Sequence, residues 1–199
     1  MSGVQYGTDE TLTCRLQNGG IMGQVINNPD ALFGNADEGG SSEWYTPKYI
    51  LERVLKVMGG IDLDPCAEKH THEGPNVPAR WHITKAEDGL KYEWHGRVFA
   101  NPPYGRCMRE WAQKFIEEYK SGRMTEGILL AHARTDTVWY SYVSGVPVCF
   151  IRGRLRFSDS KNTAPFPSAL FYVGPDPVRF AQVFNDLGSV YQPFEEQAA

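Results

Sequence analysis

Four consecutive residues, Asn101-Pro102-Pro103-Tyr104, have the types needed to position a planar amine for methyl transfer. The nitrogen of such an amine is a poor nucleophile because its lone pair is delocalised into the ring. The Asn101 side-chain carbonyl and the Pro102 backbone carbonyl can each accept one amine hydrogen, which favours a pyramidal nitrogen directed at a methyl donor. The prolines fix the backbone, and the Tyr104 ring offers a stacking surface. The alternative is that the tetrapeptide is only a tight turn.

The elements that must position this turn alternate between strands and helices. Thr46 is a good N-cap, Pro47 suits a first helical position, and the following apolar stripe ends at Gly59-Gly60. The other patterns predict strands at 61–63, 97–100, 127–131, 146–151 and 168–173, and helices at 111–119, 137–143 and 178–187. This order predicts an α/β fold whose mostly parallel sheet carries helices on both faces and binds ligands outside the carboxyl ends of its strands.

Length and composition indicate one domain. The 199 residues predict a folded domain at 41–190, preceded by a flexible arm at 1–40 and followed by a tail at 191–199. No apolar run approaches the roughly 20 residues of a membrane helix, and no secretory signal is recognisable. The four scattered cysteines suit free thiols. We therefore expect a soluble cytoplasmic protein with no membrane contact, and the oligomeric state stays open.

A second feature with possible chemistry is the basic segment that contains Arg152, Arg154 and Arg156. The net charge of -4 argues against non-specific coating of nucleic acid but says little about one face. If the arginines alternate along a strand, they share one face and can contact a phosphate backbone. The alternative is a solvated edge strand with basic residues that prevent aggregation.

Several blocks in a fixed order resemble the phage DNA N-6-adenine methyltransferase family, often called phage Dam. The resemblance covers about 43–173, and its blocks are Trp44-Tyr45-Thr46-Pro47, Asp62-Leu63-Asp64-Pro65-Cys66-Ala67, Glu87-Asp88-Gly89-Leu90, Asn101 to Tyr104, Ala133-Arg134-Thr135-Asp136-Thr137 and Gly153-Arg154-Leu155-Arg156-Phe157. The resemblance implies a Rossmann-like class I methyltransferase fold, S-adenosylmethionine as methyl donor, and the exocyclic N-6 amine of adenine in double-stranded DNA as acceptor.

The same resemblance implies the cofactor contacts Thr46, Pro47, Asp64, Pro65, Asp88 and Asn101. Thr46 would contact the methionine part of the cofactor, and Asp88 would accept a hydrogen bond from the cofactor's adenine amine. The alternatives are that Asp88 only forms a turn and that Asp64 only ends a strand. The sequence departs from the family pattern at His132, where a proline is expected, and it lacks a glycine-rich run after Ala67.

An amine inside a duplex is out of reach of the cofactor, so such an enzyme flips the target base or acts where the base is unpaired. Phe166, between two prolines, and Phe157 are candidates for a second aromatic wall opposite Tyr104, with ordinary core packing as the alternative for each. Sequence reading should come from loops, because no separate recognition domain is evident.

Three other interpretations were considered. Cys66, His70, His72 and His82 are possible zinc ligands, but their spacing matches no strong zinc pattern, so we expect no metal. The turn at Asn101 could equally position another planar amine, either the cytosine N-4 amine or a protein glutamine. A non-catalytic DNA-binding or cofactor-binding descendant is the third class of function.

Overall fold

The computed structural model describes residues 45–68, 75–157 and 163–194. The predicted arm at 1–40 lies outside these residues, as does most of the predicted tail. The elements in chain order are α1 (Lys48–Met58), β1 (Ile61–Ala67), β2 (Ala79–Thr84), the 3-10 helix η2 (Gly89–Lys91), β3 (Gly96–Ala100), α2 (Met108–Lys120), β4 (Met124–His132), α3 (Tyr140–Val143), β5 (Val148–Ile151), β6 (Ser168–Val173), α4 (Pro177–Phe184) and β7 (Gly188–Tyr191).

The strands form one sheet with the order β2-β1-β3-β4-β6-β5-β7. Strands β2, β1, β3 and β4 are parallel neighbours, whereas β6 is antiparallel to both β4 and β5, and β7 is antiparallel to β5. The sheet is therefore mixed, and the expectation of a mostly parallel sheet holds for one half only. Parallel neighbours need a long crossover connection, usually an α-helix. The described part of the link between β5 and β6 contains no helix, which agrees with the antiparallel pairing of these two strands.

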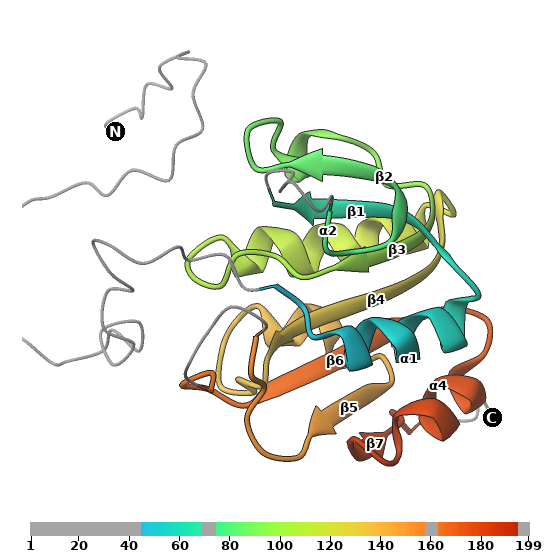
Figure 1. Ribbon diagram of the computed structural model, residues 1–199, viewed down its shortest axis with the longest axis vertical. Helices are drawn as coiled ribbons and strands as arrows, with labels where there is room; N and C mark the ends of the chain where they lie inside the picture. Colours follow the sequence, from blue (N-terminus) through green and yellow to red (C-terminus); the bar gives the residue numbers. More distant parts are fainter. Residues whose placement is uncertain (1–44, 69–74, 158–162, 195–199) are drawn as a thin grey trace, which may run out of the picture. The chain divides into compact units, whose positions relative to one another are not determined.

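Helices cover both faces of the sheet, as predicted. One apolar cluster joins Ile50 and Val54 of α1 and Phe180 of α4 to Phe99 of β3 and Ile128 of β4. A second cluster packs Trp111 and Phe115 of α2 and Val143 of α3 against Val98 and Leu129. Adjacent strand residues enter opposite clusters because side chains alternate across a strand. Figure 1 shows α1 in front of the sheet and α2 behind it.

The start of α1 differs from the prediction. Pro47 has an extended ψ of 140° and stands before the first helical residue, Lys48, so Thr46 does not cap the helix. The Thr46 hydroxyl instead accepts a hydrogen bond from the side chain of Asn101. The predicted end of the helix is confirmed, since Gly59 adopts a left-handed φ of 71° and its N–H bonds to Leu55 O.

Strand β1 is longer than predicted, and two further strands lie where none was predicted. Strand β1 continues through Asp64-Pro65 to Ala67, and its pairing with β2 shifts register between Asp64 and Ala67, where Pro65 has no N–H to donate. Strands β2 and β7 were not predicted. Both lie at the edges of the sheet, and their partly exposed residues give no sustained apolar alternation.

The strand order reverses beside β1. The chain passes from β1 to β2 on one side, and then to β3 on the other side. In α/β sheets, ligands bind outside the carboxyl ends of strands at such a switch point. Asp64 to Ala67 and Asn101 lie at the carboxyl ends of β1 and β3, which identifies this edge as the place to look for a site.

Candidate active site

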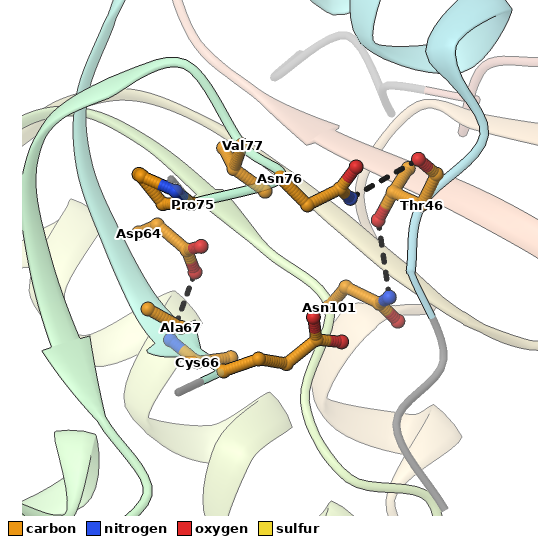
Figure 2. A pocket seen from close by; sticks show the side chains of 9 residues that line it. Thr46, Asp64, Cys66, Ala67, Pro75, Asn76, Val77 and Asn101 are labelled. Carbon is orange, nitrogen blue, oxygen red and sulfur yellow. Dashed lines mark hydrogen bonds between the residues drawn. The ribbon is translucent and has the colours of Figure 1, made fainter. Parts of the chain in front are cut away.

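A pocket lies at this switch point, between the end of β1, the end of β3 and the segments before α1 and β2 (Figure 2). Its lining residues are Thr46, Asp64, Cys66, Ala67, Glu68, Pro75, Asn76, Val77 and Asn101. The space inside it is about 20 Å³, which is room for about one water-sized group. The pocket brings together Thr46, Asp64 and Asn101, three of the residues predicted to bind a cofactor.

Hydrogen bonds connect three segments of this site in a row. Asn76 Nδ2 donates to Thr46 O at 3.1 Å, Asn101 Nδ2 donates to Thr46 Oγ1 at 3.1 Å, and the Tyr104 hydroxyl donates to Asn101 Oδ1 at 3.1 Å. Both ends of the Asn101 amide are therefore fixed by neighbours. A carbonyl oxygen has two lone pairs, so Asn101 Oδ1 can accept a further hydrogen bond from a ligand.

Asp64 is an acidic residue that lines this pocket. Its side chain is almost completely buried, and Oδ1 accepts a hydrogen bond from the Cys66 N–H at 2.9 Å. In the described ranges, none of the salt bridges includes Asp64. Burial therefore raises the pKa of this carboxyl to about 7, because the charged form is poorly solvated. A cationic or hydrogen-bond-donating ligand would supply what the carboxylate lacks.

Asp88 lies next to this site but outside the pocket lining. It has a positive φ of 66°, and its Oδ1 accepts from the Leu90 N–H at 3.2 Å, so it caps η2 as a turn former does. The turn nevertheless abuts the end of β1, since a Cβ at Gly89 would lie 2.0 Å from Pro65 O. The cofactor role of Asp88 stays a prediction. The hydrogen bond to the Leu90 N–H directly supports its alternative role as a turn former.

Aromatic rings surround Tyr104 at the same edge of the sheet. Its ring centroid lies 5.0 Å from that of Phe166, 5.5 Å from His132 and 6.4 Å from Phe157, each in an edge-to-face arrangement. The structure thus brings both predicted phenylalanines to Tyr104. A base stacked between two parallel rings needs roughly 7 Å between them, so Tyr104 and Phe166 would have to separate to admit one. Phe157 is buried among core residues, which matches its alternative role.

His132 is a neighbour of Tyr104 for which the sequence analysis predicted no role. It ends β4 and faces Ser168 of β6 across the sheet, and its ring contacts those of Phe166 and Trp139 as well as that of Tyr104. The sequence marked His132 only because a histidine stands where the family pattern has a proline, at the end of a predicted strand. A contact between residues 28 positions apart cannot be read from that signal alone.

The expectation that Arg152, Arg154 and Arg156 alternate along a strand was wrong. Strand β5 ends at Ile151, and Gly153 has a left-handed φ of 77° that turns the chain away. All three arginines are nonetheless exposed, while Leu155 between them is buried. They therefore form a basic loop after β5, and their role in phosphate contact stays a prediction.

The remaining expectations concern metal and membrane. Of the residues considered for zinc, His70 and His72 lie outside the described residues, His82 Nε2 lies 2.9 Å from Val77 O, and Cys66 lines the pocket. Across residues 45–68, 75–157 and 163–194, no group of three or more potential metal ligands comes together. The helices in those ranges are all too short or too polar to span a bilayer.

Comparison with known proteins bears on the same residues. The family model described as DNA N-6-adenine-methyltransferase (Dam) matches residues 35–168, about two thirds of the chain. The matched range contains the pocket, the Asn101 turn and Phe166. No curated protein is significantly similar to the chain in sequence. The family resemblance of the sequence blocks is thereby confirmed.

Proposed function

We propose, from the premise that this chain belongs to the DNA N-6-adenine-methyltransferase (Dam) family, that it methylates the N-6 amine of adenine in double-stranded DNA with S-adenosylmethionine as donor. One observation carries the proposal. The Asn101 amide, held by Thr46 and Tyr104, stands at the β1/β3 switch point beside the buried Asp64. This is where a methyl donor and a planar amine would have to meet.

The residues of the pocket fit the polar end of such a cofactor. When bound, S-adenosylmethionine supplies a methyl group on a sulfonium sulfur, which keeps the bonding electrons as the amine nitrogen takes the methyl group. Asp64 would supply a carboxylate for a cationic or donor group, and Thr46 and Asn76 would supply further polar atoms of the pocket lining. Pro47 and Pro65 fix the backbone beside these residues. Asp88, on the turn against Pro65, is the candidate for the adenine end.

The Asn101 turn would hold the amine of the substrate. Asn101 Oδ1 and the carbonyl of Pro102 accept its two hydrogens, which concentrates the lone pair on the nitrogen. Because Thr46 and Tyr104 already orient the Asn101 amide, little reorganisation is needed when the amine arrives. The proton that the nitrogen loses after methylation passes to water.

Access to the amine requires the base to leave the duplex stack. Tyr104 offers a ring for the flipped adenine once Phe166 moves from its edge-to-face contact. Exposed Arg152, Arg154 and Arg156 lie on the loop that leads to Phe157, and they are proposed to contact phosphates beside the flipped nucleotide.

The fold supports the same assignment. A sheet with helices on both faces and a polar pocket at its switch point is compatible with the Rossmann-like class I methyltransferase fold that we propose. We propose that the methyltransferase domain covers residues 41–191. The end is one residue later than the sequence predicted, because β7 extends to Tyr191.

The test is transfer of label from S-adenosylmethionine to unmethylated duplex DNA, followed by identification of the methylated nucleoside. We expect N-6-methyladenine from the wild type and a loss of roughly 100- to 1000-fold in Asn101→Ala, because a preorganised acceptor is removed. Asn185→Ala, at an exposed helix end, is the matched control and should keep full activity. Label on cytosine or on protein would select the other planar-amine functions, and no transfer at all would select a non-catalytic descendant.

A further inference from the structure

Val138 is an apolar side chain in an unusual setting. It exposes 68% of its surface, and among large apolar side chains in the described ranges only Phe194 exposes more. Single exposed apolar residues are common and need no explanation by themselves. The position of Val138 is what matters, because it lies in the connection after β4, at the carboxyl edge that carries the Asn101 turn.

A series of rings connects this position to the candidate site. Trp139, the next residue, is buried, and its ring centroid lies 5.1 Å from that of His132. The His132 ring lies 5.5 Å from Tyr104 in turn. Trp139 also packs on Phe171 of β6. Val138 is therefore anchored next to the aromatic group at the substrate turn while its own side chain faces solvent.

The backbone that carries Val138 is held on both sides. Before it, Arg134 and Asp136 form an ion pair with an Nη2–Oδ2 distance of 2.7 Å, and Thr137 Oγ1 donates to Arg134 O at 2.8 Å. After it, the Ser141 hydroxyl donates to Val138 O at 2.7 Å. A β-branched side chain is itself stiff about χ1. Inserting Val138 into a partner would therefore cost little conformational entropy.

Two cations, Arg106 and Arg109, lie just before and at the start of α2. Arg109 of α2 donates through Nε to the Tyr142 hydroxyl of α3 at 3.4 Å, which places the start of α2 beside the helix that follows Val138. Arg106 and Arg109 are both exposed. Phosphates of a duplex that approached this edge would find positive charge next to the apolar side chain.

We infer that Val138 is a wedge that enters the DNA base stack in the space that the target adenine leaves. The inference rests on the proposed function. A flipped base leaves an unstacked gap, and apolar side chains that insert at such gaps replace part of the lost stacking. Val138 is a positioning residue in this role, since it touches the duplex beside the reacting base and not the reacting atoms.

The experiment compares two substrates in single-turnover methylation. The first is a fully paired duplex that contains the sequence methylated by the wild type. The second is the same duplex with an abasic site opposite the target adenine, so that the adenine is already unpaired. Val138→Ala is the test variant and Val138→Leu the conservative one. Val178→Ala is the matched control, because Val178 on α4 is 59% exposed and lies far from the carboxyl edge in sequence and fold.

We expect Val138→Ala to lower the rate on the paired duplex about tenfold and to match the wild type within about twofold on the unpaired target, because the base pair no longer has to be broken and flipping costs less free energy. Val138→Leu and Val178→Ala should behave as the wild type on both substrates. Equal rates for Val138→Ala and the wild type on the paired duplex, or an equal loss on both substrates, would overturn the inference. A wild type that methylates neither substrate would overturn the proposed function as well.

Discussion

Two carboxylates on β1 stand two residues apart and have opposite surroundings. Asp62, toward the amino end, is partly exposed and pairs with Arg97, which lowers its pKa to about 2. Asp64, at the carboxyl end, is buried and forms no ion pair with any residue that the structure describes, and this burial raises its pKa to about 7. The same residue type thus stabilises the fold at one end of a strand and is costly to keep at the other. A carboxylate that costs free energy in the absence of ligand indicates a binding function.

The hydrogen bonds at the two ends of β1 agree with this difference between Asp62 and Asp64. Arg97 reaches Asp62 through Nε at 2.8 Å and Nη2 at 3.0 Å, and it also donates through Nη1 to Met58 O at 3.1 Å. One guanidinium therefore joins β3, β1 and the end of α1. At the other end, the contacts of Asp64 and Asn101 leave polar atoms facing a pocket.

The largest expected effect on stability comes from adding a side-chain atom where η2 packs against the carboxyl end of β1. In Gly89→Ala, the new Cβ would lie 2.0 Å from the backbone oxygen of Pro65, so the two segments must move apart. We expect the free energy of unfolding to fall by about 3 kcal/mol, because overpacking against backbone is poorly relieved. Denaturant titration measures this change in the free energy of unfolding. Gly145→Ala, whose Cβ would meet nothing within 4 Å, is the control, and equal stability of the two variants would contradict the packing at this end.

A smaller loss is expected at the amino end of β1. Asp62→Asn removes a bidentate ion pair that is partly screened by solvent, which should cost about 1–2 kcal/mol at neutral pH. Because the folded-state pKa lies below the ordinary 3.8, the contribution of Asp62 is present above that pH and is lost as the pH falls toward 2. Urea titrations between pH 2 and 7 measure the difference. Asp186→Asn at an exposed ion pair should change little, and a pH-independent difference for Asp62→Asn would refute the linkage.

The smallest expected effect on stability has the opposite sign. Because the folded-state pKa of Asp64 is raised, its neutral form is favoured, and stability is lost as the pH rises from 3.8 through about 7. Asp64→Asn should therefore stabilise the ligand-free protein by about 1 kcal/mol at pH 8, a gain limited by burial of the amide. Thermal unfolding at pH 5 and 8 tests this, and calorimetry should detect weaker binding of S-adenosylmethionine. A destabilised variant with unchanged affinity would mean that the two ends of β1 do not differ in function.

The sequence predicted best where one pattern was sufficient. The buried runs of β4 and β6 and the apolar stripe of α2 are visible in the sequence because packing on both faces requires them. The loop at Arg152 to Phe157 misled the prediction, because Leu155 and Phe157 alternate with arginines as in a strand but enter the core from a turn at Gly153. Local alternation cannot distinguish these two cases.

The candidate site was predictable only in its separate parts. Asn101 and Asp64 stood out because they follow strands that should end at one edge of the sheet. The sequence does not reveal that the Thr46 hydroxyl bonds to Asn101 and does not cap α1, because this depends on a partner 55 positions away. The ring contacts of His132 likewise depend on β6 inserting next to β4, which the alternation of elements did not predict.

The hydrogen bonds from Asn76 through Thr46 and Asn101 to Tyr104 join the proposed cofactor pocket to the proposed substrate turn. Any ligand that shifts Thr46 must alter the orientation of the Asn101 amide, and a base drawn onto Tyr104 must act back on Thr46. Thermodynamic reciprocity requires the two effects on affinity to be equal. Cooperativity between methyl donor and DNA can therefore be measured from either side, and Thr46→Val would remove the hydroxyl through which the two sites communicate.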